Sequence, residues 1–172
     1  MADPIKLQAL KALTTLLEGI VPSSYNGRLP PVNLVGAVFR GRSKFGDSDP
    51  DYMLSILEAP RGGGATANST GEGRLDSWPL LIQGWAPDDK DNPSDPVYFL
   101  LDDVEKRLDR IIATSSNTGQ PAYPEHYMLG LPRYVTRFEI QMGVVRPPTE
   151  NVSSKSFFYL PVQVGLARIS RE

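Results

Sequence analysis

The segment from Phe158 to Leu166 is the feature of this sequence that most constrains its fold, because apolar side chains occupy every second position. These are Phe158, Leu160, Val162, Val164 and Leu166. Successive side chains of a β-strand point to opposite faces, so the five apolar side chains would share one face. The pattern predicts a strand within 155–169 that buries this face. Pro161 has no backbone N–H, so we expect a bulge or a free edge at that point.

Shorter segments carry the same type of signal. The further predicted strands are 35–42, 52–58, 78–85, the very short 127–129, and 135–145. The segment 78–85 is apolar on both faces, which is typical of a strand in the centre of a sheet. In 135–145 the alternation predicts a shared face made by Thr136, Phe138, Ile140, Met142 and Val144.

Two segments have the period of an amphipathic helix. The first has apolar residues at Leu7, Leu10, Leu13, Leu17 and Ile20, and the second at Val97, Leu101, Val104, Leu108 and Ile111. We expect Asp3 and Asp95 to cap these helices, each followed by a proline at the first helical position. Gly19 and Pro22 would end the first helix.

The order of elements is therefore helix, three strands, helix, and two or three strands. This order predicts an α+β fold with a mostly antiparallel sheet of five to six strands and two helices packed on one face. The chain has 172 residues, of which 40% are hydrophobic, a size and composition that suit a single domain over residues 1–172. A glycine-rich loop at about 60–77 interrupts the sheet but is too short to separate two cores.

Composition excludes several classes of function. The chain has no cysteine and a single histidine, so disulfides, cysteine-ligated metals and multi-histidine metal sites are excluded. The formal net charge of −2 argues against a protein whose whole surface binds nucleic acid. No apolar run approaches the ~20 residues that span a bilayer, so we expect no membrane association. The amphipathic residues 1–20 do not resemble a signal peptide.

The segment 36–43 has the outline of a phosphate-binding loop, with glycines at positions 36 and 41. Such a loop needs a lysine to reach the phosphates, and Arg42 stands in its place. The two glycines also bracket a predicted strand, whereas a phosphate loop joins a strand to a helix. We therefore expect no nucleotide site here.

The acidic segment 88–95 resembles a calcium-binding loop at first sight. Counted from Asp89, an EF-hand needs glycine at the sixth position and glutamate at the twelfth, where this chain has Ser94 and Leu100. A solvated acidic loop that precedes the second helix explains the segment better. A weak divalent-ion site is the alternative.

His126 stands near Glu125, Tyr123 and Tyr127. A histidine that acts as a general base needs a nucleophile and an orienting partner, and no serine lies in the G-x-S-x-G pattern of a nucleophile elbow. We expect a structural or surface histidine, no catalytic, cofactor-binding or metal-binding residue, and no enzymatic activity.

The stretch from Arg61 to Arg74 contains five glycines and, between its two arginines, no large apolar side chain. It could be a disordered surface loop. It could instead be an arm that orders against a neighbouring subunit or partner, where Arg61 and Arg74 would suit carboxylates.

Several segments taken together resemble the tail terminator (tail completion) proteins of tailed bacteriophages. They are 38–47 (VFRGRSKFGD), 53–61 (MLSILEAPR), 80–86 (LLIQGWA) with the acidic loop and helix that follow, 143–148 (GVVRPP) and 154–161 (SKSFFYLP). The resemblance covers roughly residues 6–166. It rests on the order of segments and on local sequence, not on a catalytic motif.

The resemblance implies a structural virion protein in the tail and neck region, made in the host cytoplasm. Its subunits would form a homo-oligomeric ring, commonly hexameric, that caps the tail tube, stops its polymerisation and joins the tail to the neck. The partners would be the tail tube protein and a neck or head–tail connector protein, with DNA only passing through the lumen. Another neck component, such as a head–tail connector or head-completion protein, is the alternative. Candidate contacts between subunits or rings are Arg61, Arg74, Asp88, Asp89 and Asp91.

Overall fold

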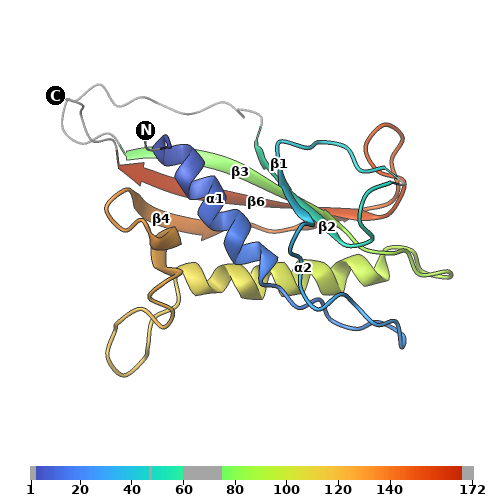
Figure 1. Cartoon of the computed structure of the whole chain (residues 1–172), viewed down its shortest axis with the longest axis horizontal. Coiled ribbons are helices and arrows are strands. Elements are labelled where there is room, and N and C mark those ends of the chain that lie inside the picture. The colour runs from blue at the N-terminus through green and yellow to red at the C-terminus, as the bar shows by residue number, and fades with distance from the viewer. Residues whose placement is uncertain (1–2, 47, 60–74, 168–172) are drawn as a thin grey trace.

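A computed structural model describes residues 3–46, 48–59 and 75–167 of the chain. The helices are α1 (Ile5–Glu18) and α2 (Asp95–Leu108), followed by the 3-10 turns η1 (Asp109–Ile111) and η2 (Tyr127–Gly130). The strands are β1 (Val38–Arg40), β2 (Met53–Glu58), β3 (Leu75–Trp85), β4 (Val135–Ile140), β5 (Val144–Arg146) and β6 (Phe157–Ala167). In Figure 1, α1 crosses in front of the long strands β3 and β6, and α2 runs below them. The predicted glycine-rich loop lies largely at 60–74, outside the described residues.

The six described strands form one sheet in the order β1-β2-β3-β6-β4, and β5 also pairs with β6. The β1–β2 pair is parallel, while β2–β3, β3–β6, β4–β6 and β5–β6 are antiparallel. The predicted α+β class and mostly antiparallel sheet are confirmed. β3 lies between β2 and β6, which confirms the central position expected for residues 78–85.

The main apolar core contains buried side chains from both helices and from one face of the sheet. α1 contributes Leu13 and Leu17, and α2 contributes Val104 and Leu108. The strands contribute Leu54, Ile56, Leu80, Ile82, Phe158, Leu160, Val162, Val164 and Leu166. Each large apolar side chain that is fully buried stabilises the fold by roughly 1.5–3 kcal/mol. The apolar face predicted for β6 is confirmed.

The other face of the sheet carries a smaller cluster made by Phe45, Met53, Trp85 and Phe157. Met53 is opposite Trp85 in β3, and Trp85 is opposite Phe157 in β6. The Trp85 indole stacks near the Phe45 ring at 5.0 Å and donates a hydrogen bond to the Pro50 carbonyl at 2.9 Å. The cluster therefore fixes the loop between β1 and β2 against the end of the sheet.

Pro161 lies in the middle of the eleven-residue strand β6, whose pairing with β3 has no bulge, so the predicted irregularity is found only on the other side of the strand. The Pro161 carbonyl accepts a hydrogen bond from Gln141 N–H at 2.9 Å, so its nitrogen faces the same neighbour. That neighbour is interrupted between β4 and β5. The interruption in the neighbouring strand removes the need for the donor that proline lacks.

The segment predicted as one strand over 135–145 is two short strands, β4 and β5. A register shift between Val135 and Arg137 places Val135 and Phe138, three residues apart, in the core. The face predicted from simple alternation was therefore right for Phe138 and Ile140, which pack in or against the main core, and wrong for the other three residues. Thr136, Met142 and Val144 are exposed.

Three local predictions also need correction. Residues 127–129 form a 3-10 turn instead of a strand. The N-cap residues are Pro4 in α1 and Ser94 in α2, so Asp3 and Asp95 each lie one residue from the cap position. Neither N-cap residue makes a side-chain hydrogen bond to its helix.

Within the described ranges, no helix is long and apolar enough to cross a membrane.

Candidate functional site

A groove opens at the end of the sheet where several connecting segments meet. We call it the loop-end groove. It encloses about 790 Å³. Its walls come from residues 28–37, from 50–52 before β2, from 87–88 after β3, and from Lys155 before β6. The cluster around Trp85 fixes two of these segments, because Pro50 accepts the indole N–H and Lys155 lies over the indole ring with its Nζ 4.5 Å from the ring centroid.

The acidic groups of the groove are engaged within the chain. Asp88 accepts a hydrogen bond from the backbone N–H of Ser156 at 2.9 Å. Asp51 pairs with Lys155 at 3.3 Å. The interactions that hold these loops together therefore use both carboxylates and the lysine.

Two hydrogen-bond donors in the same groove are not used in this way. Tyr52 is only 8% exposed, yet it lines the groove, and its hydroxyl makes no hydrogen bond to a described residue. Arg28 also lines the groove and forms no ion pair with any residue in the described ranges. Burial raises the pKa of the Tyr52 phenol, the positive charge of Arg28 opposes that rise, and the negative charges of Asp51 and Asp103 add to it. The two side chains are therefore close enough to interact electrostatically.

The loop over residues 20–36 exposes apolar side chains to solvent. Leu29 is 90% exposed and lines the groove together with the exposed Val35. Val32, in the same loop, is also largely exposed. A backbone hydrogen bond from Leu34 to Glu18 ties the loop to the end of α1. Exposed apolar groups that gather on one loop are typical of an interaction surface.

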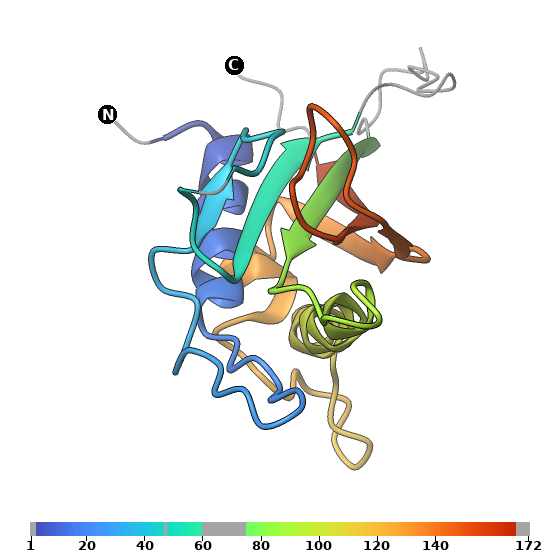
Figure 2. The same ribbon diagram turned by 90° about the vertical axis from the view of Figure 1, so that its right-hand side faces the viewer.

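A second exposed apolar surface lies at the β4–β5 edge of the sheet. Met142 is 87% exposed and Val144 is about half exposed. Figure 2 shows α2 almost end-on, with the loop over 20–36 on one side of it and the β4–β5 edge on the other. The chain thus presents apolar side chains on two separated sides.

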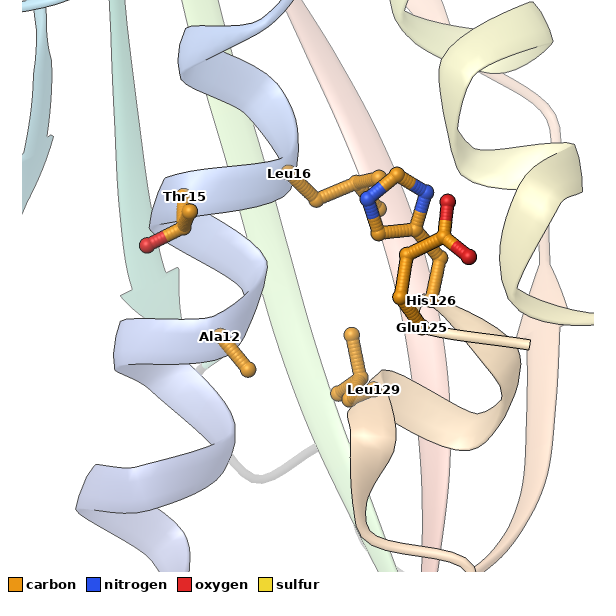
Figure 3. Close-up of a pocket in the computed structure, with 6 residues that line it drawn as sticks. All are labelled: Ala12, Thr15, Leu16, Glu125, His126 and Leu129. Atoms are coloured by element: carbon orange, nitrogen blue, oxygen red, sulfur yellow. The ribbon is translucent and has the colours of Figure 1, made fainter. Parts of the chain in front are cut away.

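His126 lies in a small pocket of about 220 Å³ between α1 and η2 (Figure 3). The imidazole lies beside the Glu125 carboxylate and near Leu16, while the Thr15 side chain points away from it. The Thr15 hydroxyl donates a hydrogen bond to the Lys11 carbonyl at 3.1 Å. The only hydroxyl lining this pocket is therefore not placed to act as a nucleophile with His126.

The surroundings of His126 oppose its protonation. Burial lowers the pKa of the imidazole, and the positive charges of Arg107 and Arg110 lower it further, whereas Glu125 opposes them. The Nδ1 atom is buried and has no hydrogen-bond partner among the described residues. The ring stacks on Tyr123 at 6.4 Å between centroids. These contacts indicate a neutral histidine that packs between helices.

The backbone after His126 is strained. Met128 and Leu129 have φ of 48° and 59°, values in the left-handed region that side chains other than glycine rarely adopt. Leu129 is buried in the main core. Burial of Leu129 and the stacked His126 ring hold the turn in this conformation, so the strain has a structural explanation.

The segment that resembles a phosphate loop is a strand flanked by two turns. Gly36 and Gly41 both have positive φ and lie on either side of β1. Arg42 pairs with Asp49 at 2.6 Å and lies over the Phe39 ring at 4.7 Å. The backbone thus does not form a cradle at the N-terminus of a helix.

The acidic loop before α2 makes mostly local contacts. Asp89 accepts hydrogen bonds from the backbone N–H groups of Asp91 and Asn92 at 3.1 and 2.8 Å. Asp91 itself is exposed. Within the described ranges, no three acidic or histidine side chains group together as metal ligands do. Of the predicted contact residues, only Asp88 lines the groove, and Arg61 and Arg74 lie outside the described residues.

The loop-end groove, Arg28 and Tyr52 were not predicted from the sequence. Arg28 lay in a segment assigned only as a loop, and Tyr52 was assigned only to the face of a strand. The signal that could have found the groove is the presence of Leu29, Val32 and Val35 in one predicted loop, because large apolar side chains in a loop are exposed unless a partner covers them.

No model of a known protein family matches the chain, and no curated protein matches it significantly.

Proposed function

We propose that this protein is the subunit of a structural ring that closes the tail tube of a tailed bacteriophage and joins it to the neck. The observation that carries the proposal is the presence of two exposed apolar surfaces on opposite sides of α2. A closed ring requires a heterologous contact, in which one surface of each subunit binds a different surface of the next. The loop over 20–36 and the β4–β5 edge could form such a pair.

Two further observations support this proposal. The local sequences that resemble tail terminators include 80–86, which ends β3, and 154–161, which begins β6, and these two strands are central in the sheet. The contacts of His126, Arg42 and Asp89 are structural. In this proposal the protein acts in the virion, and DNA passes through the ring without being bound.

The proposal is tested by reconstitution. The purified protein is mixed with tail tubes of the same phage and imaged by electron microscopy. We expect a ring at one end of each tube and a tube of defined length. A ring found only at the portal side, with tubes unchanged, would instead assign the chain to another neck component. A protein that stays monomeric with tubes present would contradict both assignments.

A further inference from the structure

We propose that the two surfaces of the ring contact recognise each other by opposite charge, so that the occupant of each surface is the oppositely charged surface of a second copy of this chain. The inference rests on the proposed function, because it concerns the same head-to-tail contact, and it adds what that contact selects. Complementary charge between two surfaces contributes mainly to the specificity and orientation of binding.

The loop over 20–36 lies against a row of aspartates. Ser23 donates hydrogen bonds from its backbone N–H and its hydroxyl to Asp103 at 2.8 and 2.7 Å, and the Tyr25 hydroxyl lies 3.5 Å from Asp95. The aspartates beside the loop are Asp89, Asp91, Asp95 and Asp103, and the cations are Arg28 and Lys90. We call the loop and these aspartates the acidic side.

The acidic side also presents apolar groups and free carboxylates. The Phe99 ring of α2 lies 5.4 Å from the Tyr25 ring and is nearly half exposed, which extends the apolar surface of the loop. Asp91 and Asp95 are exposed and form no ion pair within the described ranges. A partner can therefore meet apolar and negatively charged groups together.

The β4–β5 edge has the opposite charge. Residues 133–146, which we call the basic side, contain three arginines and one glutamate. Arg137 pairs with Glu139 at 3.5 Å. Arg133 and Arg146 are exposed and form no ion pair with a described residue. The exposed apolar side chains of this edge thus lie in a positively charged segment.

These charges favour one orientation of two subunits. The acidic side of one subunit against the basic side of the next brings unlike charges together around two apolar surfaces. A two-fold contact of either side with itself would instead bring like charges together. Repulsion in the wrong arrangement is a means of specificity. The charges therefore select the head-to-tail contact that closes a ring over a symmetric dimer.

The test reverses the charge of each side in a separate variant. The acidic-side variant is Asp91→Lys with Asp95→Lys, and the basic-side variant is Arg133→Glu with Arg146→Glu, all at exposed positions. Each variant alone places like charges across every contact, so we expect association about tenfold weaker than that of the wild type in sedimentation velocity. An equimolar mixture restores unlike charges at every contact, so we expect rings in which the two variants alternate.

The control is Asp109→Lys with Glu150→Lys, which changes the net charge by as much as the acidic-side variant, at exposed positions outside both sides. It should assemble alone. In about 1 M salt, where the Debye length is about 3 Å, the difference between the wild type and each reversed variant should shrink.

Two outcomes would overturn this inference and leave the proposed function standing. They are association of either reversed variant alone as strong as that of the wild type, and a mixture of folded variants that does not assemble while the wild type forms rings. Failure of the wild type itself to assemble would overturn the proposed function, and this inference with it.

Discussion

The main apolar core and the loop-end groove differ in the contacts that their side chains make. Under α1 and α2, the side chains of the main core are apolar and pack against one another, and α1 is tied to α2 by the hydrogen bond from Arg107 Nε to the Leu16 carbonyl at 2.8 Å. At the loop end, Asp88 and Asp51 are held by contacts within the chain, whereas Arg28 is exposed and forms no ion pair with a described residue.

This difference separates residues that maintain the fold from residues that are available to a partner. A substitution in the core should lower the free energy of unfolding. A substitution of an exposed groove side chain such as Arg28 should leave that free energy nearly unchanged.

The largest effect is expected for Leu108→Ala in α2. Leu108 is fully buried in the main core, so truncation removes apolar contacts and leaves a cavity. We expect the free energy of unfolding to fall by about 2–5 kcal/mol. Urea denaturation followed by circular dichroism measures it. A change below about 0.5 kcal/mol, which is typical of surface substitutions, would contradict the burial of Leu108 in the main core.

A smaller loss is expected for Gly84→Ala in β3. A Cβ at this position would lie 2.5 Å from both Leu54 Cδ2 and Phe158 Cε1, so neighbouring strands must shift to accept it. Overpacking of this kind costs typically 1–3 kcal/mol. The matched control is Gly46→Ala, where a Cβ would contact only the end of the Asp49 side chain at 3.9 Å. Equal stability of the two variants in thermal unfolding would contradict the strand packing.

The lowered pKa of His126 predicts that the free energy of unfolding depends on pH. Its pKa is lowered in the folded state, so below the ordinary value of about 6.5 the unfolded chain binds more protons. Stability should therefore fall as the pH drops through about 6.5, and stop falling from this cause once the pH is below the folded pKa.

The measurement is urea denaturation of wild type and His126→Gln between about pH 7.5 and 5.5, on either side of the ordinary histidine pKa. The variant should lose the dependence that comes from this residue. Glu125→Gln keeps the imidazole and removes the charge that raises its pKa, so this variant should keep a dependence at least as steep as that of the wild type. A dependence that is identical in wild type and His126→Gln would show that the pocket does not oppose protonation.

The smallest effect on stability is expected for Arg28→Gln. Arg28 is exposed and has no ion pair in the described part of the chain, so removal of its charge breaks no interaction of the fold. We expect the unfolding free energy to change by less than about 0.5 kcal/mol. A larger loss would show that Arg28 serves the fold, which would remove the contrast with the core.

Regular features of the fold could be predicted from sequence because they repeat. Alternation identified the buried face of β6, and the apolar period identified both helices, since burial selects apolar side chains at fixed spacing. The same reasoning failed in part for 135–145. A one-residue shift at Thr136 changes which residues face the core, and alternation alone carries no signal for it.

The candidate site was less predictable because it is assembled from distant segments. Arg28, Tyr52, Asp88 and Lys155 are separated by up to 127 positions and meet only when the sheet is formed. Asp88 was predicted as a contact residue, but its hydrogen bond to Ser156 could not be read from sequence. Positive φ at Met128 and Leu129 was equally unpredictable, because tertiary packing imposes it against local preference.

The central claim, a head-to-tail ring built from two different surfaces, predicts an unusual result when two variants are mixed. Val32→Asp damages the surface on the loop over 20–36, and Val144→Asp damages the surface at the β4–β5 edge. Each variant keeps one intact surface, so an equimolar mixture can form a single contact between unlike partners. Ile112→Asp, an exposed apolar residue outside both surfaces, is the control.

Sedimentation velocity at high protein concentration makes the measurement. We expect a ring for wild type and for Ile112→Asp, a monomer for Val32→Asp alone and for Val144→Asp alone, and a dimer with no larger species for their mixture. Rings formed by either single variant, or a mixture that stays monomeric while wild type assembles, would contradict the head-to-tail arrangement.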